Sequence, residues 1–146
     1  MRCVVQRVSR ARVVVEGEGV GSIDHGLLAL VGAMRGDTQE DVAVVARKLA
    51  TLRVFPDAAG RMSLSVKDVA GKILLVSQFT LCAELAKGAR PSFTAALEPE
   101  AAALLLDAMA AALAREVTVE RGRFGAHMQV ELVNDGPVTL WIDSRT

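Results

Sequence analysis

The run KILLVSQF, residues 72–79, is the feature that most constrains the fold. Four consecutive apolar residues stand between Lys72 and Ser77. A strand with one wet face alternates apolar and polar side chains, whereas an unbroken apolar run of this length is typical of a strand buried on both faces. The run therefore predicts a central strand with packing partners on each side of its sheet.

The segment before this run is mostly strand, followed by one helix. The β-branched runs predict strands over residues 3–8 and 11–17, separated by Ser9 and Arg10, and the apolar segment 26–33 predicts a third strand. Asp37 or Thr38 is positioned to cap a helix, with acids in its first turn and basic residues later, ending at about Leu52. Pro, Asp and Gly residues then predict a turn-rich connection over residues 55–65.

The segment after the run predicts a loop, a second helix and further strands. Residues 82–93 are polar and contain Gly88 and Pro91, which favours a surface loop. Residues 98–116 are rich in Ala and Leu, with Pro99 at the first turn, and predict the clearest helix of the chain. Residues 117–120, 127–133 and 138–143 predict strands, the last two joined by a hairpin turn at NDG.

The order of these elements predicts an α/β fold in a single domain, residues 1–146. We expect mixed, largely antiparallel β-sheets that form a barrel-like layer, with two main helices packed on it. A length of 146 residues, 51% of them hydrophobic, suffices for one packed core.

The charge and composition exclude several classes of function. Lys and Arg total 17, as do Asp and Glu, so any RNA contact has to come from a local basic cluster. Aromatic residues are only 3%, too few for extensive stacking on single-stranded bases. The N-terminus lacks a secretory h-region, and no apolar run is long enough to span a membrane. Cys3 and Cys82 have no partner spacing and favour reduced thiols, so we expect a cytoplasmic protein.

The common catalytic motifs are absent. The chain has no GxSxG, P-loop, GxGxxG or HExxH sequence. His25 and His127 stand in unrelated contexts without a nearby nucleophile, so surface or turn histidines are the favoured interpretation. We expect no metal and no cofactor.

Two short segments deserve a functional interpretation beside the plain one. In SQFTL, residues 77–81, a buried strand ends among polar side chains. The plain interpretation is a strand end whose polar groups form hydrogen bonds with one another. The alternative is that main-chain N–H groups leaving the sheet point into a pocket. In NDGPV, residues 134–138, the plain interpretation is a turn followed by an edge-strand proline. The alternative is a cis Gly136–Pro137 bond that presents a carbonyl to a ligand.

Taken together, five segments resemble the D-aminoacyl-tRNA deacylase family. They are VQRVSRA (5–11), SQFTL (77–81), KGARPSF (87–93), GRFGA (122–126) and LVNDGPVTL (132–140), and they cover essentially the whole chain. The resemblance implies hydrolysis of the ester between a D-amino acid and tRNA, and also of glycyl-tRNA, as a quality-control step in translation. It also implies a homodimer whose active pockets lie at the subunit interface.

The resemblance assigns roles to particular residues. Ser77, Gln78, Phe79, Thr80 and Leu81 would form one wall of the pocket, with the first four as the catalytic segment. Gly136 and Pro137 would reach into the partner's pocket, with Arg7 holding them and Asn134 beside them. Three positions depart from the family pattern: Ala89 replaces one of two expected arginines, Cys82 a common tyrosine, and His127 a usual aspartate. The first departure bears on affinity for tRNA.

The chemistry is feasible without a catalytic triad, because an aminoacyl ester is already activated toward water. The N–H groups of Phe79 and Thr80 are candidates for an oxyanion hole, worth roughly 3 to 4 kcal/mol per donor. The 2′-hydroxyl of the substrate can help to activate water, which makes Thr80 a positioning group; attack by its own hydroxyl would need a base.

Selection and binding are assigned to other groups. Rigid carbonyls of the Gly136–Pro137 turn would reject L-amino acids by forming a main-chain wall. Lys87 and Arg90, with Arg47, Lys48 or Arg53, are candidates for phosphate contacts at the 3′ end of tRNA. Two alternatives stay open: a trans-editing deacylase for L-aminoacyl-tRNA and a noncatalytic nucleic-acid-binding module. We expect neither DNA nor a membrane as a partner.

Overall fold

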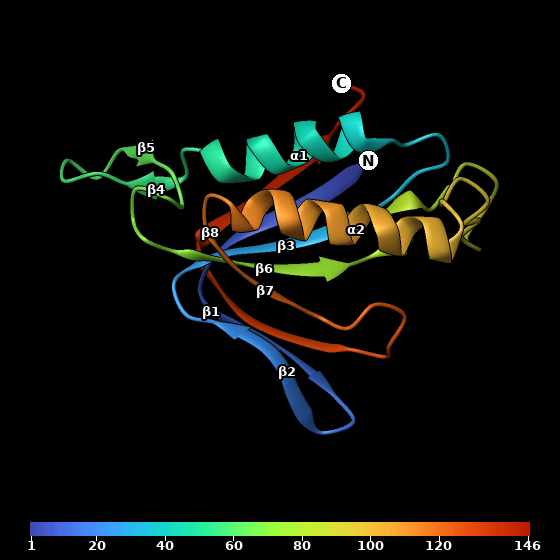
Figure 1. Ribbon diagram of the computed structural model, residues 1–146, viewed down its shortest axis with the longest axis horizontal. Helices are drawn as coiled ribbons and strands as arrows, with labels where there is room; N and C mark the ends of the chain where they lie inside the picture. Colours follow the sequence, from blue (N-terminus) through green and yellow to red (C-terminus); the bar gives the residue numbers. More distant parts are fainter.

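The computed structural model describes residues 1–146 and has one mixed sheet, two main helices and a small second sheet (Figure 1). In chain order the elements are β1 (Arg2–Val15), β2 (Glu18–Ile23), β3 (Gly26–Gly32), α1 (Gln39–Thr51), β4 (Phe55–Pro56), β5 (Met62–Leu64), β6 (Lys72–Ser77), the 3₁₀-helix η1 (Phe79–Cys82), α2 (Pro99–Ala114), β7 (Thr118–Arg121) and β8 (Gln129–Asp143). The α/β class expected from the sequence is confirmed.

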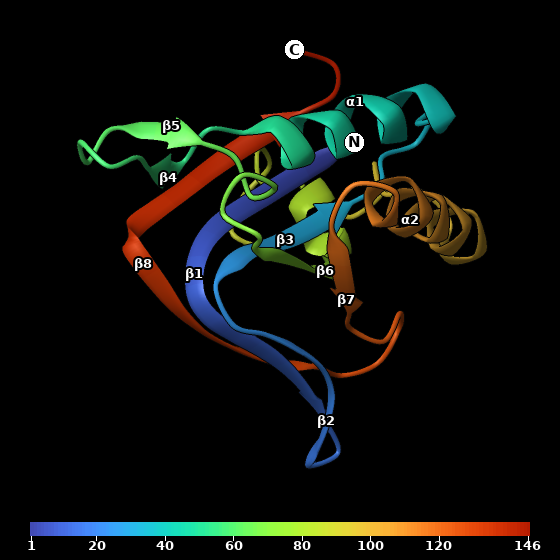
Figure 2. The same ribbon diagram turned by 60° about the vertical axis from the view of Figure 1, so that its left-hand side comes forward.

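The main sheet is built around the long strand β1. Its order is β2-β1-β3-β6-β7, and β8 also pairs with β1. The β3–β6 and β6–β7 pairs are parallel, while the pairs made by β1 are antiparallel. β1 pairs with β3 through its first half and with β2 through its second, and in Figure 2 it curves strongly with β8 beside it. This curvature brings β2 against β7 and gives the sheet its nearly closed, barrel-like form.

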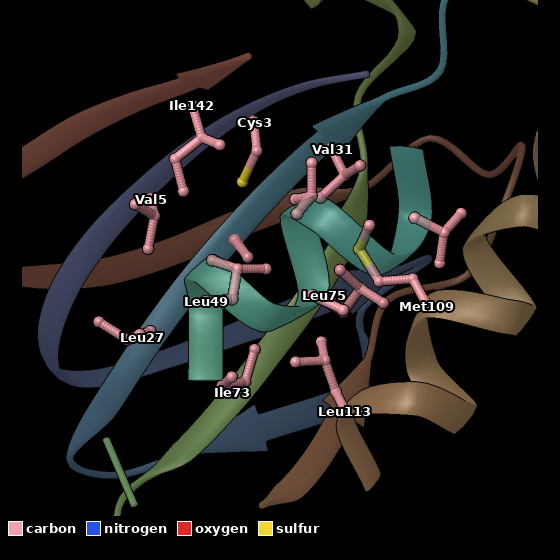
Figure 3. Close-up of a cluster of buried hydrophobic side chains, with 14 of the residues drawn as sticks. Cys3, Val5, Leu27, Val31, Leu49, Ile73, Leu75, Met109, Leu113 and Ile142 are labelled. Carbon is pink, nitrogen blue, oxygen red and sulfur yellow. The ribbon is translucent and has the colours of Figure 1, made fainter. Parts of the chain in front are cut away.

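The strand β6 is buried on both faces, as its apolar run predicts. Ile73 and Leu75 belong to a core cluster of 24 buried residues between the sheet and the helices, part of which Figure 3 shows. Leu74 and Val76 belong to a second cluster of 8 buried residues inside the curved part of the sheet. Alternate side chains of this one strand therefore pack into two cores, one on each side of the sheet.

The two helices cover the same side of the sheet and lie side by side (Figures 1 and 2). α1 begins as predicted, because the Thr38 side chain accepts from the Glu40 N–H and Asp41 accepts from the Thr38 N–H to complete a capping box. α2 has Pro99 in its first turn. Neither helix has the length and apolar character that crossing a membrane would require.

Two boundaries predicted from the sequence are wrong. The predicted strands 3–8 and 11–17 are one strand, because Ser9 and Arg10 occupy its bend, where the register with β8 shifts, and do not form a turn. The predicted strand over 72–79 ends at Ser77, where the chain winds into η1. The connection over 55–65 also contains the short β4–β5 pair.

The hairpin predicted at NDG is wrong as well. Residues on both sides of it pair with β1 in the same antiparallel direction, from Val14 opposite Gln129 to Arg2 opposite Asp143. The chain therefore does not reverse at Asp135 and Gly136. A DG pair favours a turn locally, but the long edge of β1 offers pairing partners to both flanks and keeps them in one strand.

Candidate active site

A mainly apolar pocket of about 560 Å³ lies where β6 ends. The lining residues come from four parts of the chain: the end of β3, the end of β6, the first half of α2 with the segment before it, and the start of β8 with the segment before it. Ser77, Gln78 and Phe79 belong to this lining, as the resemblance implied for the pocket wall. A cavity of this size and composition suits a small organic ligand.

The main chain leaves the β-ladder inside this pocket. The Gln78 N–H donates to the Val31 carbonyl at 2.8 Å, and the first bond of η1 runs from the Leu81 N–H to the Gln78 carbonyl at 3.2 Å. The N–H groups of Phe79 and Thr80 fall between these two bonds, at the start of a helix, where amides have no intrahelical acceptor. They are the donors that the strand end makes available to a ligand.

The close approach of β3 to η1 requires a glycine at position 32. A Cβ atom built there would lie 2.7 Å from the Gln78 carbonyl oxygen and 3.0 Å from the Cys82 sulfur. Because backbone cannot yield at such a distance, a larger residue would push η1 away from the sheet. Gly32 thus contributes to the position of the catalytic candidates without touching a ligand.

Aromatic side chains from separate motifs meet at the pocket. The rings of Phe79 and Phe93 form an edge-to-face pair with centroids 5.0 Å apart, and Phe124 lines the same pocket. Phe79 is 58% exposed despite this contact. An exposed apolar ring at a pocket mouth is available for contact with a ligand or another chain.

Thr80 and Leu81 lie outside the pocket lining. The Gln78 side-chain amide donates to the Thr80 hydroxyl oxygen, and the Leu81 carbonyl accepts from Arg2 Nη1 at 3.0 Å. A hydroxyl that accepts from an amide is not thereby deprotonated, so this contact orients Thr80 without activating it as a nucleophile.

The second motif-rich region is the bulge in β8. Gln6 pairs with Thr139 and Val8 pairs with Asn134, so residues 135–138 stand opposite Arg7 alone. The Gly136–Pro137 peptide bond is cis, and both residues are exposed. The sequence analysis gave a cis bond here as the alternative interpretation of NDGPV, and the structure has that bond.

Two side chains hold the ends of this bulge. Arg7 donates from Nε to the Asp135 carbonyl at 3.0 Å and from Nη1 to the Val54 carbonyl at 2.6 Å. The Asn134 amide donates to the carbonyls of Arg7, at 3.0 Å, and of Val138, at 2.9 Å. The Arg7 side chain is only 12% exposed. Its two hydrogen bonds connect the bulge to the segment after α1, and those of Asn134 connect the bulge to β1.

The pocket and the bulge are separate within one chain. Gly136 and Pro137 are not among the residues that line the pocket. Val31 pairs with both Cys3 and Ser77, whereas the bulge stands opposite Arg7. Four residues along β1 correspond to about 13 Å at ~3.3 Å per residue. The two groups of residues that the resemblance joins are therefore not joined by this chain alone.

The basic candidates all lie on the surface. Lys87 and Arg90 are exposed in the loop between η1 and α2, and Arg47, Lys48 and Arg53 are exposed on and after α1. None of the five forms an ion pair within the chain. Their charges are thus free to contact phosphates.

Titratable groups near the pocket do not form a nucleophile–base pair. His127 lines the pocket, whereas His25 packs edge-on against Phe55 with ring centroids 5.0 Å apart. Burial raises the pKa of Cys3 to about 12 and also raises the pKa of Cys82, so both sulfurs stay protonated thiols. No group of three or more His, Cys, Asp or Glu residues is arranged to hold a metal ion.

Several pocket residues were not found from the sequence. Arg35 and Glu98 line the rim, and Ala102 and Leu106 of α2 form part of the wall. The first two look like ordinary surface charges, and the other two like ordinary core positions of an amphipathic helix. Only the packing of α2 against the ends of β3 and β6 brings them together. The place of Phe124 had one indication, since it lies in the GRFGA segment.

The fold and the pocket define a class of protein: a single α/β unit with an apolar pocket at a strand end and a rigid exposed bulge elsewhere. The sequence profile of the D-Tyr-tRNA(Tyr) deacylase family matches residues 4–143. A D-aminoacyl-tRNA deacylase of Chloroflexus aurantiacus is 59% identical over 99% of this chain and 91% of its own length. One of Halalkalibacterium halodurans is 51% identical over 99% and 100%. The chain belongs to the D-Tyr-tRNA(Tyr) deacylase family.

Solved structures share the fold. A protein described as c-Myc DNA unwinding element binding protein is 41% identical, with a TM-score of 0.93 and 98% of each chain covered. A probable eukaryotic D-amino acid tRNA deacylase is 17% identical, with a TM-score of 0.83 over 97% of each chain. The second likeness concerns the fold alone.

Proposed function

We propose that this protein hydrolyses the ester that joins a D-amino acid, or glycine, to the terminal adenosine of tRNA, and so removes mischarged tRNA before translation. The names of its relatives support the reaction. The observation that carries the proposal is the pocket at the end of β6, where the free main-chain N–H of Phe79 borders an apolar cavity and that of Thr80 follows it along the chain.

The main chain supplies the stabilisation that the reaction needs. Attack of water on the ester carbonyl places negative charge on its oxygen in the tetrahedral intermediate. The N–H groups of Phe79 and Thr80 are the donors for this oxygen, and one such donor lowers the barrier by roughly 3 to 4 kcal/mol. Because the ester is already activated, orientation and two such donors suffice without a triad.

The water molecule is activated by the substrate. The ribose hydroxyl next to the ester is within reach of an attacking water, and no base stands beside Thr80. Thr80 therefore acts as a positioning group, held by Gln78, and Ser77 and Leu81 support the same segment. The active protein needs no cofactor in this scheme.

A second chain completes the site. The pocket and the Gly136–Pro137 bulge are apart in one chain. Each nevertheless contains one of the motifs that resemble the deacylase family, SQFTL in the pocket and LVNDGPVTL in the bulge. In a two-fold symmetric dimer, the exposed bulge of each subunit would enter the pocket of its partner. Arg7 and Asn134 hold the bulge in a shape that does not need the partner in order to form.

The bulge selects against L-amino acids. Main-chain carbonyls fixed at a bulge bind the substrate ammonium group and leave no room for a side chain on the L face. A D side chain points away from this wall, and glycine has none, so both are accepted. A site that discriminates with fixed polar groups rejects the wrong substrate far better than an apolar pocket does.

The surface loop contacts the nucleic acid. Lys87 and Arg90 are exposed beside the pocket-forming segment, with no carboxylate partner, and contact tRNA phosphates. Arg47, Lys48 and Arg53 are additional candidates. The place of action is the cytoplasm, where tRNA is charged.

One experiment tests the main proposal. The protein is incubated with D-tyrosyl-tRNA, L-tyrosyl-tRNA and glycyl-tRNA, and ester loss is followed against buffer. We expect rapid loss of the D-tyrosyl and glycyl esters with the L-tyrosyl ester preserved. Loss of the L-ester at a similar rate would favour an L-specific editing deacylase instead.

A nucleic-acid-binding function is the second candidate, because one related structure is described as a DNA unwinding element binding protein. The balanced charge of the chain, 17 basic and 17 acidic residues, speaks against tight DNA binding. Stable binding of single- or double-stranded DNA at about 0.15 M salt, together with no loss of any aminoacyl ester, would decide for this alternative.

A further inference from the structure

We propose that Arg35 is a phosphate-binding residue at the rim of the pocket, which takes the phosphodiester on the 5′ side of the terminal nucleoside. This inference rests on the proposed function, since it concerns how the same pocket holds the end of an RNA. Arg35 is the only Lys or Arg among the residues that line the pocket.

The size of the pocket places a phosphate at its rim. A cavity of about 560 Å³ accommodates an amino acid and one nucleoside. The next nucleotide has to stay outside, so the phosphodiester that joins it to the terminal nucleoside crosses the rim. A phosphate that crosses the rim loses part of its hydration, which is costly without a counter-charge. A cation at the crossing point removes this cost.

The backbone of Arg35 is firmly held. Its N–H donates to the Ala95 carbonyl at 2.9 Å, and its carbonyl accepts from Arg145 at 2.7 Å. An isolated β-bridge joins the neighbouring Met34 to Ala96. The side chain therefore starts from a fixed point between the end of β3 and the segment that leads into α2, and only its flexible end has to reorient.

The present partner of Arg35 is easily exchanged. Its guanidinium lies 2.9 Å from Glu98 Oε1 and 3.3 Å from the Ala96 carbonyl. The two charged side chains are 63% and 69% exposed, and exposed ion pairs of this kind contribute little to stability because water screens them. A phosphate accepts two parallel bonds from a guanidinium and is the stronger partner. Glu98 thus holds Arg35 at the rim until the substrate arrives.

The start of α2 lies at the same rim. Glu98 is the N-cap of α2, and Pro99 and Ala102 also line the pocket. The Glu98 side chain makes no capping hydrogen bond, but this helix end already carries the carboxylates of Glu98 and Glu100. The positive charge for a phosphate at the rim is therefore that of the Arg35 guanidinium and not that of the helix end.

The test compares two short substrates that differ by one phosphodiester. They are the D-tyrosyl ester of adenosine and the D-tyrosyl ester of cytidylyl-(3′→5′)-adenosine. In Arg35→Ala we expect kcat/KM to fall about tenfold on the dinucleotide ester, chiefly through KM, because a charged hydrogen-bond pair is lost. The ratio of dinucleotide to nucleoside activity should fall at least fivefold. Arg35→Lys, which cannot form the two parallel bonds, should give an intermediate ratio.

Two further variants sharpen the result. Glu98→Gln removes the competing carboxylate and should raise the ratio about twofold. Arg61→Ala removes an arginine that is 81% exposed on the loop between β4 and β5, away from the pocket lining, and should leave the ratio as in the wild type. The inference is overturned if Arg35→Ala lowers both activities equally, or lowers neither. If the wild type hydrolyses neither ester nor D-tyrosyl-tRNA, the proposed function fails first, and this inference fails with it.

Discussion

The pocket at the end of β6 and the bulge in β8 are both rich in motif residues, but they are built in opposite ways. The pocket is concave and mainly apolar, and its useful polar groups are main-chain donors near Phe79 and Thr80. The bulge is convex and exposed, and its ends are fixed by donors from Arg7 and Asn134 to main-chain carbonyls. One region offers donors in a cavity, and the other exposes the main chain of Gly136 and Pro137 between two anchored ends.

Under the proposed function, the two regions would bind different groups of one substrate. A tetrahedral oxyanion needs donors, whereas an ammonium group needs acceptors. Neither region alone can bind both. Since the two lie about 13 Å apart along β1 by strand geometry, we propose that a complete site consists of the pocket of one chain and the bulge of another.

The strongest test of this comparison combines two variants, one with a blocked pocket and one with a distorted bulge. Ala96→Trp fills the pocket, and Gly136→Ala places a Cβ atom 2.8 Å from Arg7 Nη2 in a residue with φ of 129°. Each variant alone should lose at least ~100-fold in kcat/KM, because small misplacements have large effects on catalysis. After the two are unfolded and refolded together, about a quarter of wild-type activity should return.

This recovery has a simple origin. Half of the dimers in an equal mixture are mixed, and each mixed dimer has one site with an intact pocket and an intact bulge. Circular dichroism of each variant alone checks that both fold. Absence of any recovery from two folded, dimeric variants would show that a site is completed within one chain.

The second prediction concerns the anchor of the bulge. Arg7→Ala removes the bonds to the Asp135 and Val54 carbonyls, so the bulge loses its fixed direction. We expect the preference for D-tyrosyl-tRNA over L-tyrosyl-tRNA to fall about tenfold, more than the turnover of the D-ester falls. Rates on both esters give the ratio directly. Unchanged selectivity in a folded Arg7→Ala protein would contradict the assignment of selection to the bulge.

The third prediction separates the pocket from the surface loop that we propose to contact RNA. Lys87→Gln combined with Arg90→Gln should reduce the slope of log kcat/KM against log salt by about 1 to 2, since each phosphate contact contributes ~0.7 to 0.9. Rates on D-tyrosyl adenosine should not change with these substitutions. The matched control is Arg61→Gln, whose side chain is exposed but remote from the pocket lining. An identical slope for the double variant and the wild type would remove this loop from the RNA contact.

The smallest expected effect concerns the scaffold beneath both regions. The pKa of Asp41 is lowered, first by the hydrogen bond from Ser144 and then by that from the Thr38 N–H. A carboxyl group with a lowered pKa stabilises the fold above its unfolded pKa of about 3.9, and this contribution is lost as pH falls through the folded pKa. Asp41→Asn should therefore lower the free energy of unfolding by about 1 kcal/mol at pH 7.

The difference should begin to shrink as the pH falls below about 4 and should be lost only below the lowered pKa of Asp41 in the folded protein. Urea unfolding at pH 7 and at pH 3 measures it, with activity at pH 7 as the control, because Asp41 touches neither the pocket nor the bulge. An equal difference at both pH values would show that the charge of Asp41 is not what stabilises the start of α1.

Local patterns predicted much of the fold. The apolar run of β6, the helix cap expected at Asp37 or Thr38 and the proline at the start of α2 act over a few residues, and each prediction is confirmed, with Thr38 as the cap. Predictions failed where distant pairing overrides local preference. Ser9 and Arg10 do not break β1, and the DG pair does not make a hairpin, because β1 and β8 pair along most of their lengths.

The site was predictable only in part. Ser77, Gln78 and Phe79 could be predicted because a recognisable motif ends a buried strand. Arg7 could be predicted because the family resemblance assigns to this position the arginine that holds Gly136 and Pro137. Arg35 and Glu98 could not be found, since nothing within their own segments distinguishes them from surface charges. Their role depends on the bridge that sets the end of β3 beside the start of α2.

The sequence by itself determined the class of fold, the doubly buried strand, the start of both helices and membership in the family, because periodicity, capping and motifs are properties of neighbouring residues. The tertiary structure alone decided that β8 is continuous, that the pocket has a charged rim, and that the pocket and the bulge are separate. These features depend on which strands pair and in what register, and long-range pairing is set by the packing of the whole chain.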